Sequence, residues 1–155
     1  MNLSLNRSDD AQLPWLDENV VESMRKAGAS LNPEAVTVNI VVVDDPCIRG
    51  INRDFRGIDK ATDVISFSYI GDAEPAPAGG EDVAGEVYIS YQTIEKEAKE
   101  LGVDPGSLFL RVGVHGLLHV VGFDHAGDED AALMEQEERA ILSRIVASNE
   151  LDAMF

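Results

Sequence analysis

The sequence predicts one domain over residues 1–155, of the α+β or α/β class, with a single small sheet. Three observations lead to this fold class. A chain of 155 residues suits one hydrophobic core. Short runs rich in β-branched residues, such as residues 36–43 (VTVNIVVV), are typical of buried strands. Such runs alternate with helical stretches along the whole chain, so we expect a mixed sheet packed by about five helices.

In the N-terminal half, the order of apolar runs and helix signals predicts two strands and two helices. They are a strand at Leu3–Leu5, a helix from Asp10–Pro14 to about Ala27, a strand at Val36–Val43 and a helix at residues 45–56. Gly28 and Gly57 should end the two helices, because glycine readily adopts the left-handed conformation of a C-cap. Asp45 is the expected N-cap of the second helix, with Pro46 as its first helical residue.

The C-terminal half predicts five further elements. They are strands at Val64–Tyr69 and Gly85–Ser90 and helices at Tyr91–Leu101, Ser107–Val121 and Asp128–Ser148. Between the two strands, residues 71–82 (GDAEPAPAGGED) combine acids, prolines and glycines. That composition predicts a mobile loop rather than a linker between domains.

The charge balance limits the classes of partner. Twelve basic and 29 acidic side chains give a formal net charge of −17. Such a surface repels nucleic acid as a whole, so any binding of RNA or DNA must depend on a local basic patch. The sequence has no apolar run of membrane-spanning length and no signal-peptide pattern at its start, which favours a cytoplasmic protein. The single cysteine, Cys47, excludes a disulfide within the chain and a cysteine-based zinc site, and we expect a packed, inert thiol.

All three histidines of the chain, His115, His119 and His125, lie within eleven residues. On a helix, His115 and His119 point the same way, so their ring nitrogens can converge on one zinc ion. Gly122 can turn the chain after the helix and so return His125 to the same ion. Three protein ligands leave one coordination position open for water, which is typical of a catalytic rather than a structural zinc. We therefore expect one Zn²⁺ per chain.

The histidine helix is apolar in nearly every direction, which predicts a buried helix, and Gly113 and Gly116 indicate close approach by a neighbouring element or by substrate. The spacing of the histidines and Gly122 resembles that of the metzincin proteases, so we expect a zincin-like metal helix. Those enzymes carry a glutamate general base directly after the first histidine. Here that residue is Gly116, which cannot accept a proton, so protease chemistry of that type is not supported.

Residues 115–125 (HGLLHVVGFDH) resemble the signature of the YbeY family, the bacterial rRNA maturation factors. Residues 51–67 and 84–90 resemble two further family segments in the same order. Two departures are Glu86, where the family has aspartate, and a missing proline after Phe67. The resemblance implies an α+β fold and a single-strand-specific, zinc-dependent endoribonuclease. It also implies a role in maturation of the 16S rRNA 3′ end and in ribosome quality control, with the small ribosomal subunit as partner.

A local basic segment gives this chemistry its expected phosphate contacts. Residues 49–60 carry a net charge of +2 within the acidic chain. Arg56 matches the family arginine and is the expected catalytic cation. Arg49, Arg53 and Lys60 are the expected RNA-phosphate contacts.

Three questions stay open at the level of the sequence. Asp124 is expected to orient His125, although a role as general base is an alternative. Whether water or the 2′-hydroxyl attacks is undetermined. Other zinc hydrolases, peptidases included, and a non-catalytic ribosome-associated zinc module are the competing hypotheses.

Overall fold

A four-stranded mixed sheet forms the centre of the computed structural model, which describes residues 1–31, 36–70, 83–123 and 127–155. The strand order is β1-β2-β4-β3, where β1 is Asn2–Arg7, β2 is Thr37–Val43, β3 is Val64–Ser68 and β4 is Val83–Ser90. Strands β1, β2 and β4 are parallel, and β3 pairs antiparallel with β4 at the edge of the sheet. The predicted mixed sheet and the α+β class are therefore confirmed. The loop predicted at residues 71–82 lies outside the described residues.

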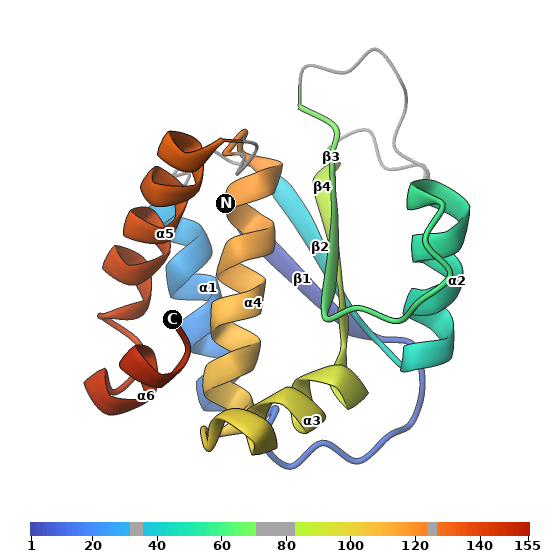
Figure 1. The fold of residues 1–155 in the computed structure, drawn as a ribbon, viewed down its shortest axis with the longest axis horizontal. Coiled ribbons are helices and arrows are strands. Elements are labelled where there is room, and N and C mark those ends of the chain that lie inside the picture. The colour runs from blue at the N-terminus through green and yellow to red at the C-terminus, as the bar shows by residue number, and fades with distance from the viewer. Residues whose placement is uncertain (32–35, 71–82, 124–126) are drawn as a thin grey trace.

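Six helices surround this sheet in the described part of the chain. They are α1 (Glu18–Leu31), α2 (Asp45–Arg56), α3 (Tyr91–Leu101), α4 (Pro105–Val120), α5 (Asp128–Leu142) and α6 (Ser148–Ala153). Helices α1 and α4 cover one face of the sheet, α5 packs outside them, and α2 lies on the opposite face (Figure 1). No helix of the described ranges has both the length and the apolar character needed to cross a membrane.

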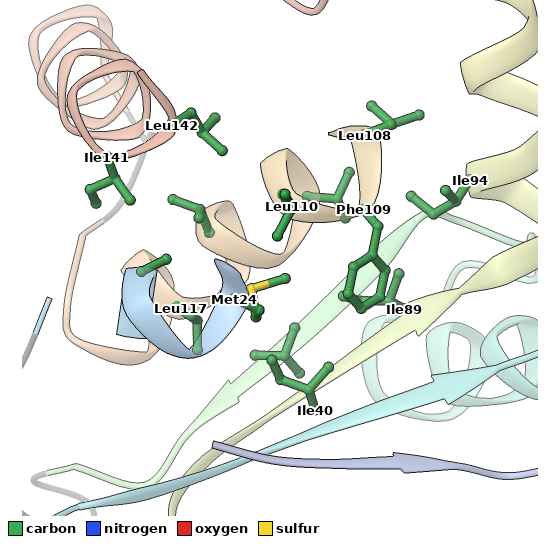
Figure 2. Packing of buried hydrophobic residues seen from close by; sticks show 14 of the residues in the cluster. Met24, Ile40, Ile89, Ile94, Leu108, Phe109, Leu110, Leu117, Ile141 and Leu142 are labelled. Carbon is green, nitrogen blue, oxygen red and sulfur yellow. The ribbon is translucent and has the colours of Figure 1, made fainter. Parts of the chain in front are cut away.

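Alternation along the strands divides the apolar side chains between two clusters. On β4, Val87 and Ile89 belong to the main core with α1 and α4. On β3, Ile65 and Phe67 belong to a smaller cluster with Ile48 of α2. Successive side chains of a strand point to opposite faces, so the two clusters lie on opposite sides of one sheet. In the main core, Met24 of α1 reaches between α4 and the sheet (Figure 2).

Two glycines allow α4 to lie close to its neighbours. A Cβ added at Gly113 would lie 2.1 Å from Cε of Met24, and one added at Gly116 would lie 2.6 Å from Cγ1 of Val87. The expected close approach is therefore made by neighbouring elements of the fold. Helix α4 is buried along most of its length, as its apolar sequence predicts.

The predicted boundaries of the first helix are wrong at both ends. Helix α1 begins at Glu18 rather than near Asp10–Pro14, because the side chain of Asp17 accepts a hydrogen bond from the backbone N–H of Val20 at 3.0 Å. The helix continues through Gly28 to Leu31. Gly28 is buried, and a Cβ there would lie 3.1 Å from Leu3 of β1. This glycine therefore serves helix–sheet packing and does not end the helix.

Three other expectations in the helical segments need correction. The N-cap of α2 is Asp44 rather than Asp45, because its side chain accepts from the N–H of Cys47 at 2.9 Å. Cys47 itself is an exposed residue rather than part of the packed core, since it lies in the first turn of α2. The predicted helix Asp128–Ser148 ends earlier, at Leu142, and a separate short helix, α6, begins only at Ser148; the turn between them lets Leu151 of α6 join the core.

Candidate metal centre

Two histidines of α4 converge one helical turn apart. The Nε2 atoms of His115 and His119 are 3.2 Å apart, and the rings meet edge to face at an interplanar angle of 82°. Both residues are half-buried, whereas most of α4 is fully buried. The i, i+4 spacing thus places both rings on the same side of the helix, as expected.

Each ring is oriented by a second contact through Nδ1. The Nδ1–H of His115 donates to the carboxylate of Glu138 on α5, and the Nδ1–H of His119 donates to the backbone carbonyl of Phe123 at 3.0 Å. A carboxylate and a carbonyl only accept hydrogen bonds, so the network assigns a proton to Nδ1 of each ring. Both Nε2 atoms are then left as the lone-pair donors that a metal requires.

The turn after α4 supplies the acceptor for His119. Gly122 has a φ of 107°, which favours glycine, and the backbone N–H of Phe123 bonds back to the carbonyl of Leu118 at 3.0 Å. The side chain of Ser68 on β3 donates to the carbonyl of Val120 at 2.7 Å and fixes the same end of the helix. The turn that the sequence assigned to Gly122 is therefore present, and it holds the imidazole of His119 in place.

The geometry of the two histidines fits a zinc ion. Two nitrogens bound at 2.0–2.1 Å in a tetrahedral arrangement lie about 3.3 Å apart, close to the observed 3.2 Å. The expected third ligand, His125, and its expected partner Asp124 lie outside the described residues. Within the described ranges no three side chains of the metal-binding types come together. A complete site therefore needs a ligand beyond them, and His125 stays the prediction.

Glu138 is the site residue that sequence reasoning missed. It is 3% exposed and lies on the buried side of α5 with Met134, Ile141 and Leu142. A glutamate within an apolar stripe at helical spacing is a detectable signal, because glutamate is almost never fully buried without a partner. The partner, His115, lies 23 residues earlier and could not be read from local sequence.

The basic residues of the α2 segment are exposed, and two of the four form ion pairs with described residues. Arg49 donates to Asp59 from Nε at 2.8 Å and from Nη2 at 3.2 Å. The hydrogen bond from Arg49 lowers the pKa of the Asp59 carboxyl below its usual value. Arg53 pairs with Asp54 at 3.0 Å. Together with Lys60, the two arginines line an open cavity of about 720 Å³.

Arg56, the expected catalytic cation, is exposed at the last residue of α2 and has no ion pair or hydrogen bond with a described residue. Helices α2 and α4 cover opposite faces of the sheet (Figure 1). No described contact brings Arg56 together with His115 or His119. Its catalytic role therefore stays a prediction.

Comparison with known proteins gives consistent matches over most of the chain. The model of the family described as Endoribonuclease YbeY matches residues 5–146. An Endoribonuclease YbeY of Desulforamulus reducens is 38% identical over 146 residues, which cover 93% of this chain and 94% of that protein. One from Rhodospirillum rubrum is also 38% identical, over 82% of this chain, which spans 65% of that protein's length. The solution structure of TM1509 from Thermotoga maritima aligns with a TM-score of 0.63 and 26% identity, covering 92% of this chain and 88% of that one.

Proposed function

Because the chain belongs to the endoribonuclease YbeY family, we propose that it is a zinc-dependent, single-strand-specific endoribonuclease. The proposed substrate is precursor rRNA at the 16S 3′ end, and the proposed partner is the small ribosomal subunit in the cytoplasm. A role in ribosome quality control belongs to the same proposal. The observation that carries the proposal is the convergence of the Nε2 atoms of His115 and His119 at 3.2 Å.

The chain's own residues fit the demands of this chemistry. A bound zinc ion with an open position supplies a water of pKa about 7 and polarises a phosphoryl oxygen. His115 and His119 would hold the ion, with His125 as the third ligand. Glu138 fixes the tautomer and the ring direction of His115, and the carbonyl of Phe123 does the same for His119.

The proposed RNA path follows from the positions of the basic residues. Arg49 and Arg53 form exposed ion pairs, which contribute little stability, so a phosphate can compete for either guanidinium. Arg56 is proposed to contact the scissile phosphate, where a guanidinium stabilises developing negative charge. Since α2 and α4 lie on opposite faces of the sheet, an RNA strand that contacts both must pass from one face to the other, and β3 is the edge strand beside both helices.

A peptidase of the metzincin type is disfavoured by packing as well as by chemistry. The residue after His115 would have to be a glutamate, yet a Cβ at Gly116 would already lie 2.6 Å from Val87. A structural zinc module would need a fourth protein ligand to close the coordination shell. The described residues add none to the two histidines.

The deciding experiment is cleavage of single-stranded RNA by purified protein, with duplex RNA and unstructured peptides as parallel substrates. Wild-type protein with zinc should cut single-stranded RNA, and both chelation and His119→Ala should abolish the cuts. Cleavage that survives both changes would show a contaminant or a metal-independent reaction. Zinc binding without cleavage of any substrate would favour the non-catalytic module.

A further inference from the structure

A small cavity lies on the face of the sheet turned away from the histidines. Its volume is about 70 Å³, and its walls are Ile51, Phe55, Phe67, Tyr69, Glu86 and Tyr88. These residues come from α2, β4 and the β3 edge, so the cavity opens between α2 and the sheet. None of the roles proposed above for the zinc site or for the basic side chains involves this cavity.

The carboxylate of Glu86 is held by two tyrosines. Glu86 is 5% exposed, and its Oε1 accepts from the hydroxyl of Tyr69 at 2.7 Å and its Oε2 from that of Tyr88 at 3.3 Å. Burial, together with the nearby Glu86, raises the pKa of Tyr88 to about 12 and raises that of Tyr69 further, so both phenols are neutral donors at pH 7. An ionised carboxylate has about four acceptor positions, so two hydrogen bonds leave it able to accept more.

Glu86 has no lysine or arginine partner in the described part of the chain. Every lysine and arginine of the sequence lies within the described residues, and none of them forms an ion pair with Glu86. Burying a carboxylate without a positive partner is costly. A positive group entering the cavity from outside would therefore gain a strong, already oriented acceptor.

Aromatic rings complete the walls around this carboxylate. Phe55 and Phe67 meet at 5.2 Å with an interplanar angle of 73°, and Phe67 and Tyr88 meet at 5.9 Å and 88°. Phe55 is 66% exposed at the mouth, although such a large apolar ring is usually buried. Ring faces attract cations, so an aromatic wall beside a carboxylate favours a positively charged occupant.

The cavity size selects the kind of occupant. Sites for small molecules typically enclose about 300–1,000 Å³, so a cavity of about 70 Å³ has room for the tip of one side chain and not for a nucleobase. We propose that this pocket binds the guanidinium group of an arginine presented by a basic protein partner. A guanidinium matches a carboxylate bidentately and stacks on aromatic rings, whereas an ammonium does neither. The net charge of −17 favours encounter with such a partner.

The test is an NMR titration of the full chain with a capped Gly-Gly-Arg-Gly-Gly peptide. The matched peptide carries citrulline, which keeps the shape of arginine without its charge. We expect the arginine peptide to shift the amide signals of Phe67 and Tyr88 and to bind at least tenfold more tightly than the citrulline peptide. Equal affinities, or shifts elsewhere on the protein, would overturn the proposal.

Two variants localise the effect. Glu86→Gln should weaken binding of the arginine peptide at least tenfold, whereas Glu95→Gln, the same change at an exposed site on α3, should leave it unchanged. If Glu86→Gln does not fold, Phe55→Ala at the exposed mouth provides the test, and wild-type affinity in it would contradict the proposal. A parallel titration with nucleoside monophosphates that shifts Phe67 and Tyr88 more strongly than the peptide would assign the pocket to RNA instead.

Discussion

The buried carboxylate of Glu138 on α5 accepts a hydrogen bond from Nδ1 of His115 on α4. This contact fixes which nitrogen of His115 faces the proposed zinc ion, and it joins the two helices at the candidate site. A carboxylate in this position is a common outer partner of a metal-binding imidazole. Glu138 is therefore a positioning residue, and its removal should affect metal binding before it affects the fold.

We expect Glu138→Gln to lower zinc affinity about 10–100-fold, because outer-shell partners of metal-binding histidines typically contribute that much. Competition with a chromogenic chelator measures the dissociation constant directly. Glu137→Gln, the same change at the exposed neighbouring residue, is the matched control and should bind zinc as the wild type does. Equal affinity in both variants would remove Glu138 from the site.

Zinc should stabilise the folded protein, since an ion that binds only the native state adds free energy of unfolding. At a thousandfold excess over the dissociation constant the gain is about 4 kcal/mol. Thermal melting of wild-type protein with zinc and with a chelator measures it, and elemental analysis should find close to one zinc per chain. His119→Ala should melt at one temperature under both conditions. A zinc-dependent rise in the Tm of that variant would place the ion elsewhere.

Packing around α4 gives a prediction that is independent of metal. Gly116→Ala gains about 1 kcal/mol in helix propensity but places a methyl group 2.6 Å from Val87, and overpacking of this kind typically costs about 1–3 kcal/mol. We expect a net loss of stability, partly restored by adding Val87→Ala. Gly50→Ala in α2 is the control, because a Cβ there meets nothing closer than 3.8 Å. Urea denaturation should show it to be more stable than wild type.

Local signals in the sequence predicted most elements but not the choices that packing decides. The β-branched run at residues 36–43 and the helix ending at Gly57 needed no long-range information. The start of α1 required long-range information, because Asp10 and Asp17 are both plausible N-caps. Burial of Leu13 and Leu16 before the helix favours Asp17. Helical periodicity likewise places Arg49, Arg53 and Arg56 on one side of α2, but it cannot tell which face of the sheet that helix covers.

The exposed Cys47 should react slowly with iodoacetamide at neutral pH. Partial burial of the sulfur and the nearby Asp44 carboxylate both disfavour the thiolate, so both raise the pKa of this thiol. The alkylation rate should therefore rise only at a pH above the range usual for free cysteine. Asp44→Asn keeps an N-cap residue and removes the charge, and it should move the midpoint to lower pH. A wild-type midpoint below that of free cysteine would mean that the α2 N-terminus outweighs both effects.

The last prediction distinguishes the proposed role of Arg56 in catalysis from that of Arg49 in RNA binding. Arg56→Ala should retain zinc and the fold but lower the cleavage rate at saturating RNA by a hundredfold or more, the usual loss for a transition-state contact. Arg49→Ala should instead weaken RNA binding. That weakening should shrink as salt rises, because a phosphate contact of this kind acts through counterion release. The loss of affinity in Arg49→Ala should also be modest, since Arg49 must break its ion pair with Asp59 before it can bind a phosphate.

Single-turnover cleavage with each variant at several salt concentrations measures rate and affinity separately. Asp59→Asn serves as the matched variant, because it releases Arg49 without removing it and should strengthen RNA binding at low salt. An Arg56→Ala protein that cleaves at the wild-type rate when saturated would exclude Arg56 from the chemical step. The RNA would then have no need to reach both faces of the sheet, and the residue that contacts the scissile phosphate should be sought on the face that carries His115 and His119.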